Sequence, residues 1–333
     1  MLSVNSKSAK PIFNNMAKIM NDAIKYNSKN VFTVFISFSN ELILAYVNDY
    51  NQIVFYDLSE FKLLNKYDCS HNEIISFLKH FKDREKNRDI LVSISDMDCI
   101  AKIWVYKKPS LSCVLDLGNI YNNGMIKGAC FVPYDTMIYL LVINLGNNNN
   151  GDNIKLINIV TNKIFVFQNT NQPSNQIESF INRNKVFILV YILSYIKSYI
   201  FDPLSLTLSL YKKYIDKKES EHIYFEIFTH DGFQAKIIDS DNDGVIRIWD
   251  FDSCVLLHKI RINNNYADIC LYNNYLLFLQ TEGLKLMDIK SGKIVTFYKL
   301  SNKWDNIICI EHFKYGKCVL FKDKNFIGLI AFK

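Results

Sequence analysis

Proline and glycine are scarce in this chain, with five prolines and eleven glycines among 333 residues. Apolar residues make up 49% of the sequence and aromatic residues 14%. A chain with this many core-forming side chains is not expected to be disordered over any long stretch. The composition therefore predicts a compact, soluble, β-rich protein, and a single domain can account for its full length.

The sequence also lacks an apolar run long enough to cross a bilayer. The longest such run, Val186 to Ile196, has eleven residues, whereas a membrane-spanning helix needs about 20. We interpret the run as two buried strands, Lys185 to Ile192 and Lys197 to Asp202. A turn around Ser194 and Tyr195 joins them. No membrane span is expected.

A secretory signal and closely spaced cysteines are absent as well. The first residues are polar without an apolar core, which does not fit a signal peptide. Zinc sites and redox dithiols need close-spaced ligands, and no C-x-x-C pair occurs. We therefore expect a reducing, intracellular location, the cytoplasm or alternatively the nucleus, in which most cysteines are small core residues. The eight cysteines are Cys69, Cys99, Cys113, Cys130, Cys254, Cys270, Cys309 and Cys318.

Motifs that carry catalysis are missing too. The sequence has no G-x-S-x-G, no P-loop and no G-x-G-x-x-G, and its six histidines do not form H-E-x-x-H. The acidic cluster of Asp241, Asp243, Asp250 and Asp252 does not follow the spacing of a calcium loop, so we interpret it as turn chemistry. We expect no catalytic residue, no metal, no cofactor, no small-molecule substrate and no enzymatic activity.

What the chain does contain is a distinctive segment, Ser240 to Asp250, which reads S-D-N-D-G-V-I-R-I-W-D. Asp243-Gly244 predicts a two-residue hairpin turn, because both central positions of such a turn need φ > 0. The strand that follows presents large apolar side chains to both of its faces. This suits a sheet packed between two neighbours.

Weaker copies of this turn-strand pattern recur along the chain. Positions equivalent to Trp249 are 56, 104, 157, 201, 249, 287 and 330, so the intervals between them run from 38 to 53 residues. These intervals are close to the roughly 40–45 residues of a WD repeat. The sequence thus resembles the WD-repeat β-propeller family over nearly its whole length, as a divergent member.

This resemblance implies an all-β fold, a seven-bladed β-propeller of four-stranded antiparallel blades. Residues 31–333 would form the propeller, and the N-terminal segment 1–30 would hold a closure strand for the last blade, a short helix, or both, within residues 12–26. The expected blades cover 31–68, 73–117, 124–168, 175–214, 221–262, 266–300 and 306–333.

The resemblance also implies structural roles for particular residues. Two hydrogen-bonded sets inside blades are expected, one of His71, Asp98 and Trp104, and one of His222, Asp243 and Trp249. The family's serine position is occupied by Ile94 and Asp239, so both sets are expected to be incomplete. The other signature residues are Gly244, Asp250, Asp57, Asp202 and Asp288.

The net charge of +6 is mild for this length and is spread over mixed segments. Such segments are usually solvated loops. Four basic residues, Lys82, Arg84, Lys213 and Lys217, could contact an acidic partner if they met on one face. The leading hypothesis is a non-catalytic scaffold that binds other proteins within a complex. The alternative is an RNP- or ribosome-assembly-associated propeller that contacts RNA or acidic partners.

Overall fold

Every regular element of the described chain is a β-strand. The structure is a computed structural model, and it describes residues 17–18, 31–48, 50–95, 97, 99–119, 125–145, 152–170, 174–192, 195–216, 222–228, 235–241, 243–262, 266–272, 275–280, 283–299, 304–312, 316–323 and 327–331. Within these residues, no helix is long and apolar enough to cross a bilayer.

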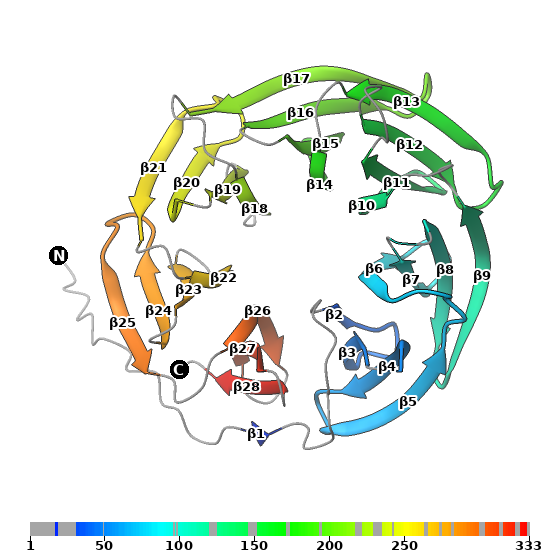
Figure 1. Ribbon diagram of the computed structural model, residues 1–333, viewed down its shortest axis with the longest axis horizontal. Coiled ribbons are helices and arrows are strands. Elements are labelled where there is room, and N and C mark those ends of the chain that lie inside the picture. The colour runs from blue at the N-terminus through cyan, green and yellow to red at the C-terminus, as the bar shows by residue number, and fades with distance from the viewer. Residues whose placement is uncertain are drawn as a thin grey trace.

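The described strands form four-stranded antiparallel sheets arranged as a ring, which is a β-propeller (Figure 1). Six of the sheets are complete blades built from consecutive strands, with the first strand of each blade nearest the axis of the ring. Blade 1 is β2 (Phe32–Ile36), β3 (Leu42–Val47), β4 (Gln52–Asp57) and β5 (Lys62–Asp68); blade 2 is β6 (Ile75–Asp83), β7 (Arg88–Ser95), β8 (Ile100–Lys107) and β9 (Ser110–Asn119); blade 3 is β10 (Met125–Tyr134), β11 (Met137–Leu145), β12 (Asp152–Asn158) and β13 (Ile164–Thr170). Blade 4 is β14 (Ser174–Asn182), β15 (Lys185–Ile192), β16 (Tyr195–Asp202) and β17 (Thr207–Ile215); blade 5 is β18 (His222–Phe228), β19 (Lys236–Asp241), β20 (Val245–Asp250) and β21 (Leu256–Arg261); blade 6 is β22 (Tyr266–Tyr272), β23 (Tyr275–Gln280), β24 (Gly283–Asp288) and β25 (Ile294–Lys299).

The last sheet differs from these six. It consists of β26 (Trp304–His312), β27 (Gly316–Asp323) and β28 (Ile327–Ala331), and its fourth strand, β1 (Ala17–Lys18), has only two residues. Ala17 pairs with Leu329 and Lys18 with Gly328. The prediction of seven equivalent blades is therefore confirmed only for six. The sequence pattern misses the difference because it reports strands, not the length over which they pair.

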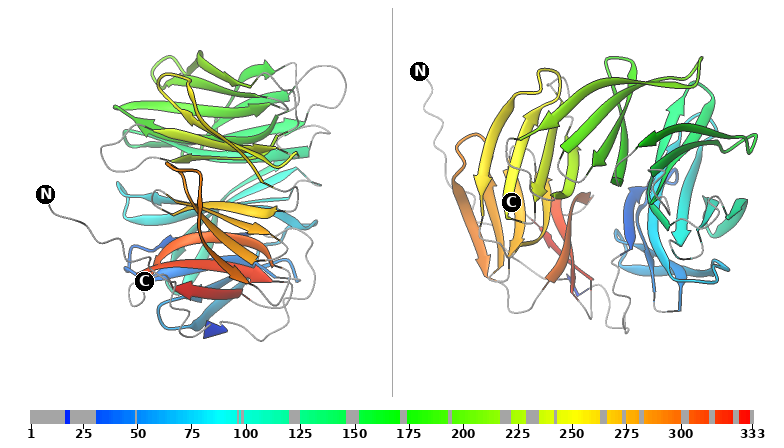
Figure 2. Two further views of the ribbon diagram at one scale, coloured as in Figure 1. Left: turned by 90° about the vertical axis from the view of Figure 1, so that its left-hand side faces the viewer. Right: turned by 45° about the horizontal axis from the view of Figure 1, so that its top comes forward.

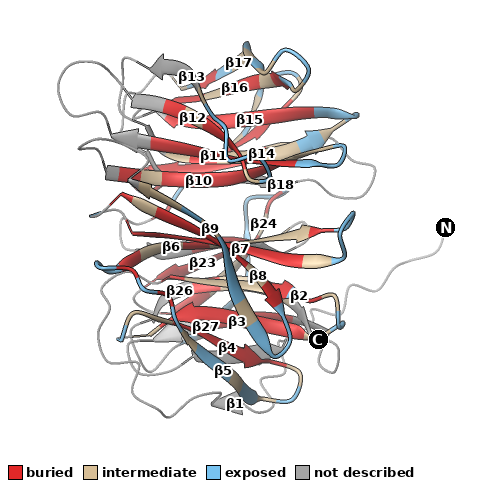
Figure 3. Ribbon diagram, turned by 90° about the vertical axis from the view of Figure 1, so that its right-hand side faces the viewer, coloured by how far each residue is buried: buried red, intermediate tan, exposed pale blue. Residues whose placement is uncertain are grey.

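Hydrophobic clusters between neighbouring blades hold the ring together. Each cluster takes residues from two consecutive sheets, which stack face to face (Figure 2). Between blade 1 and the last sheet, Leu44 and Tyr56 pack with Cys318 and Leu320. A strand inside a blade thus has two buried faces, as in β3, where all six residues are buried. Outer strands such as β5 are mostly exposed (Figure 3).

The two strands predicted in the longest apolar run are confirmed as β15 and β16. The second begins two residues earlier than expected, at Tyr195, because Tyr195 pairs with Ile192 and Ile215 on either side. Tyr195 therefore belongs to the sheet and not to the turn.

The turn between β19 and β20 is not the two-residue hairpin that Asp243-Gly244 suggested. Gly244 has φ of +74°, whereas Asp243 is not among the residues with positive φ. The Gly244 N–H donates to the Asp241 carbonyl at 3.1 Å. Asp241 Oδ1 also accepts the Asp243 and Val245 N–H groups, both at 2.9 Å. These contacts make a three-residue connection that ends in a left-handed glycine, which is the other common hairpin type.

Candidate functional site

The signature histidine and tryptophan of blade 2 meet at a serine. Trp104 Nε1 donates to Ser93 Oγ at 2.8 Å, and His71 Nε2 is hydrogen-bonded to the same oxygen at 2.8 Å. Placing the serine position at Ile94 was wrong. The β7–β8 connection has one residue more than the β19–β20 connection, so counting back from the tryptophan misses Ser93 by one. Asp98, the third predicted member, lies outside the described residues.

In blade 5 an aspartate takes the place of that serine. Trp249 Nε1 donates to Asp239 Oδ2, and Asp239 lies opposite Arg247 in the ladder, just as Ser93 lies opposite Lys102. The predicted member Asp243 lies in the turn instead, and the side chain of His222 is outside the described residues. The blade 5 set therefore differs in its members from the set we predicted.

Arg247 is the centre of the blade 5 network and was not predicted. Its side chain is fully buried. Nε donates to Asp216 Oδ2 at 2.9 Å, Nη1 to Asp239 Oδ1 at 3.0 Å, and Nη2 to Asp241 Oδ2. Burial alone would lower the pKa of Arg247, but the hydrogen bond to Asp216 and the charges of the other carboxylates raise it above its ordinary range. The guanidinium therefore stays charged and ties the end of blade 4 to blade 5.

The aspartates that end the third strands serve the turns that follow. Asp57 Oδ1 accepts the Ser59 N–H at 2.8 Å. The same arrangement is made by Asp202 with Leu204 at 3.0 Å, Asp250 with Ser253 at 2.8 Å, and Asp288 with Ser291 at 2.6 Å. Side-chain acceptors of this kind stabilise tight turns. These four signature residues, like Gly244, are thus placed in the frame of the blades.

The basic residues singled out in the sequence lie in separate places. Lys82, at the end of β6, donates to the carbonyls of Ile36 and Ser37 at 3.1 and 3.4 Å. Arg84 is exposed in the turn between β6 and β7. Lys213 is on β17, with Nζ 3.8 Å from the centroid of the Tyr195 ring. Lys217 lies outside the described residues.

The described side chains offer little for metal or thiol chemistry. No group of three or more His, Cys, Asp or Glu side chains that could hold a metal ion occurs among them. Burial raises the pKa of the Cys69 and Cys130 thiols to about 12. Five described cysteines are buried, Cys254 is half-buried and Cys113 is exposed. Cys309 lies in β26, and its side chain is outside the described residues.

A cavity of about 210 Å³ lies where the first strands of blades 2, 3 and 4 come together. Its apolar lining is Phe81, Phe131, Pro133, Phe180, Ile181 and Val186. The polar lining includes Lys79 of β6 and Glu178 of β14, which form an ion pair across the inner strand of blade 3. Sequence reasoning missed this site, because its walls come from three different repeats.

The cavity lies toward one face of the ring. We call it the A–B face, since the turns between the first and second strands lie there, at 84–87, 135–136 and 183–184 in blades 2 to 4. Large aliphatic side chains are exposed on this face in blades 3 and 4: Ile181 at 55%, Val160 at 55% and Leu204 at 85%. We call these three residues the apolar arc.

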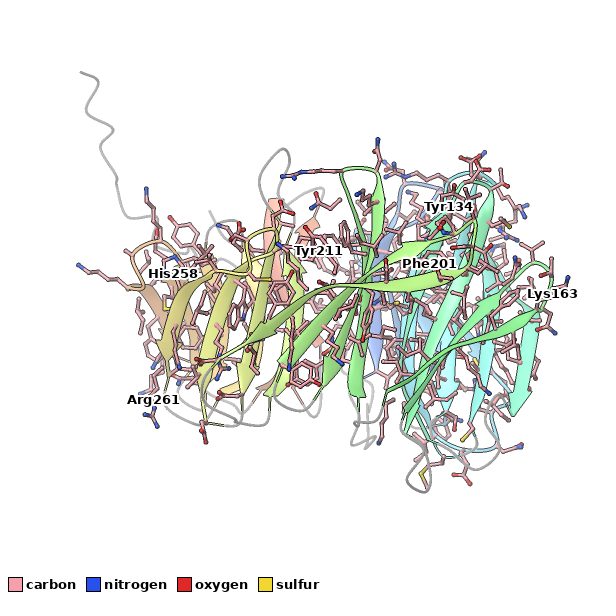
Figure 4. The ribbon with its side chains drawn as sticks, turned by 90° about the horizontal axis from the view of Figure 1, so that it is seen from above. Tyr134, Lys163, Phe201, Tyr211, His258 and Arg261 are labelled. Atoms are coloured by element: carbon pink, nitrogen blue, oxygen red, sulfur yellow. The ribbon has the colours of Figure 1, made fainter. Side chains whose placement is uncertain are left out.

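Aromatic rings pack in the core between blades 3 and 4. Tyr139 and Phe201 pack edge to face with centroids 6.0 Å apart, and Tyr134 packs against the same core cluster. Figure 4 shows Tyr134 and Phe201 near the same edge of the ring, and Lys163 at its outer side. Blades 3 and 4 are therefore joined by an aromatic-rich core.

Solved structures share this architecture, although the two sequence comparisons find no match. No protein-family model matches the chain, and no curated protein is significantly similar in sequence. Raptor from Chaetomium thermophilum is similar with a TM-score of 0.68 and 13% identity, over 93% of this chain and 28% of the Raptor chain. BBS1N, solved in complex with ARL6DN, is similar with a TM-score of 0.68 and 9% identity, over 94% of this chain and 95% of that one. At these identities the likeness concerns the fold alone.

Proposed function

We propose that the protein is a non-catalytic β-propeller scaffold of the WD-repeat type, which holds other proteins together in a cytoplasmic complex. In this proposal the last sheet is a seventh blade closed by an N-terminal strand. The observation that carries the proposal is the apolar arc beside the cavity. Large exposed aliphatic side chains gathered on one face commonly mark sites of protein contact.

The contacts of the buried polar residues support the same function. The main buried ionic and hydrogen-bonded groups of blades 2 and 5 are engaged with other groups of the propeller, as Arg247 is with Asp239 and Asp241 of its own blade and with Asp216 at the end of blade 4. Groups engaged in this way stabilise a rigid frame. The proteins with the similar folds, Raptor and BBS1N in its complex with ARL6DN, suggest by analogy that such a frame presents surfaces to partners.

Affinity purification of the tagged protein from its own cells, followed by mass spectrometry, tests this proposal. We expect the wild type to recover partner proteins and the Val160→Glu/Leu204→Glu variant to recover smaller amounts of them. The matched control is Leu210→Glu/Ile215→Glu on β17, where the exposures are 61% and 50%. Recovery of no partner above background by the wild type would overturn the scaffold proposal.

A second candidate function, contact with RNA in a ribonucleoprotein, is favoured by one observation. Lys197 and Lys213 lie directly opposite each other on β16 and β17, and both ammonium groups lie over the Tyr195 ring, at 5.5 and 3.8 Å from its centroid. Like charges directly opposite in a sheet destabilise it, and an anionic partner would relieve that repulsion. Among the described residues, neither lysine forms a salt bridge with a carboxylate.

Salt titration of binding to a single-stranded RNA distinguishes this candidate. The logarithm of the affinity should fall linearly with the logarithm of salt concentration, and Lys197→Gln/Lys213→Gln should make the slope shallower by about 1.4 because two phosphate contacts are lost. A slope that the double variant does not change would exclude this pair as an RNA site.

A further inference from the structure

We propose that the cavity between blades 2, 3 and 4 receives one apolar side chain of a partner protein, from a segment that carries Asp or Glu next to that residue. This inference rests on the proposed scaffold function and adds the chemistry of the partner. It assigns a binding role to the A–B face at a place where none of the signature residues lies.

The size of the cavity sets the size of what enters it. Pockets for drug-sized ligands measure about 300–1,000 Å³, whereas this cavity measures about 210 Å³. Its six apolar lining residues, three of them phenylalanines, provide a surface for one leucine, isoleucine, methionine or phenylalanine side chain. Buried anchors of this kind supply much of the binding energy in protein interfaces.

The walls are held in place before any partner arrives. The Ser179 hydroxyl donates to the Phe131 carbonyl, which ties β14 to β10. The Phe81 and Phe131 rings lie 5.3 Å apart, which ties β10 to β6. A preformed pocket does not have to be ordered on binding, so less of the interaction energy is lost.

The charges inside the cavity argue against an ionic ligand. Lys79 and Glu178 form an ion pair with each other, so neither charge is left to hold a phosphate or a carboxylate. Removing either group from its partner would leave the other partly buried charge uncompensated. The interior therefore selects an apolar group.

The rim of the cavity is basic. Four exposed basic residues come shortly after Phe81 and Ile181 in the chain: Arg84 and Lys86 in the turn of blade 2, Arg183 in the turn of blade 4, and Lys185 at the start of β15. The acidic residues in the turns of blades 2 and 3 are Glu85 and Asp135. Arg183 is already paired with Asp252 of blade 5 at 2.9 Å, so Arg84, Lys86 and Lys185 are the basic residues that a partner's carboxylate would meet. Charge complementarity therefore favours acidic residues beside the anchor.

A display library of random peptides, selected on the full-length protein, provides the test. Dissociation constants of the enriched peptides are then measured against two variants, each with a matched control, and against one conservative variant. Ile181→Trp covers the mouth of the cavity, and Ile215→Trp, at a similar exposure on β17, is its control. Arg84→Glu/Lys185→Glu reverses the rim charge, and Lys290→Glu/Lys293→Glu makes the same change in exposed turn positions of blade 6. Ile181→Val keeps the site and should bind as the wild type does.

We expect enriched peptides to share an apolar residue adjacent to Asp or Glu. Ile181→Trp should weaken them about tenfold or more, which corresponds to about 1.4 kcal/mol, and Arg84→Glu/Lys185→Glu should weaken them mainly through slower association. The two control variants should bind within about twofold of the wild type. Melting curves confirm that each variant is folded.

Three results would overturn the proposal: enrichment of no peptide, enrichment of basic peptides, or binding that Ile181→Trp leaves unchanged. Cellular partners decide whether the scaffold function fails as well. If the Ile181→Trp protein still recovers them by affinity purification, the scaffold stands and this cavity is not its docking site. If the wild type recovers none, the scaffold proposal itself fails.

Discussion

Replacing Arg247 by methionine should test how much the buried charge network of blade 5 contributes to stability. Arg247 is fully buried, and Asp239 and Asp241 beside it have side chains that are 1% and 0% exposed. In Arg247→Met these two carboxylates lose their countercharge without gaining water. Removing one partner from a buried ionic network costs about 3–5 kcal/mol.

The expected change in melting temperature follows from the size of the protein. Unfolding entropy is about 2.1 cal/mol/K per residue, or about 0.7 kcal/mol/K for this chain, so a loss of 3–5 kcal/mol lowers Tm by about 4–7 °C. Urea denaturation and calorimetry measure both quantities. The control is Arg183→Met, which removes an ion pair whose arginine is 73% exposed and should cost less than about 1 kcal/mol.

A rescue variant separates charge from packing. Arg247→Met/Asp239→Asn/Asp241→Asn removes the uncompensated charges and still leaves residue 239 able to accept the Trp249 N–H. It should recover at least half of the lost free energy of unfolding, since that loss comes from buried carboxylates without a countercharge. If Arg247→Met is within about 1 kcal/mol of the wild type, or if the triple variant is as unstable as the single one, this explanation of the network is wrong.

Three further predictions follow from the structure. Ser93→Ala should lower the free energy of unfolding by about 1–3 kcal/mol, because Ser93 is the shared hydrogen-bond partner of Trp104 and His71. The control is Ser112→Ala, which changes an exposed serine on β9. Equal losses of stability in the two variants would contradict the role assigned to Ser93. Burial lowers the pKa of His80 below its ordinary value, despite its hydrogen bond with Asp89 at 2.9 Å. The imidazole therefore binds a proton more readily in the unfolded chain than in the folded one. The free energy of unfolding should be unaffected by His80 above about pH 6.5 and should fall as the pH is lowered below it. A His80→Gln variant should show a shallower loss in urea denaturation between pH 6.5 and 5, and an unchanged slope would rule out this contribution. Removal of residues 1–26 should lower Tm by several degrees, because it deletes β1 from the last sheet, and an identical melting curve would show that the pairing adds nothing.

The sequence predicts the strands well because their signals are local. The run from Val186 to Ile196 is too apolar for a half-exposed strand, which indicates a strand buried on both faces, and β15 and β16 are such strands. The aspartates at strand ends are equally local, since each accepts a hydrogen bond from a residue two or three positions later. Features that depend only on residues close together in the sequence can be predicted from a single repeat.

Features that depend on register or on neighbouring blades could not be read in this way. Ser93 was missed because one additional residue in a turn shifts every position before it. Arg247 could have been found: it alternates with Trp249 on a strand whose two faces are both covered, so it must be buried and needs acidic partners. The cavity could not, because its lining depends on how three separate repeats pack.

The pairing of Ala17 with Leu329 also has a consequence for biosynthesis. A ribosome makes β1 before the six complete blades and β28 after them, so the two strands cannot pair until all of these blades have been made. Until then, the faces of blade 1 and the last sheet that later pack together, including Leu44 and Leu320, have no mutual cover. Contacts between such distant residues form slowly. We expect the newly made chain to depend on chaperones at the junction between blade 1 and the last sheet more than at any junction between consecutive blades.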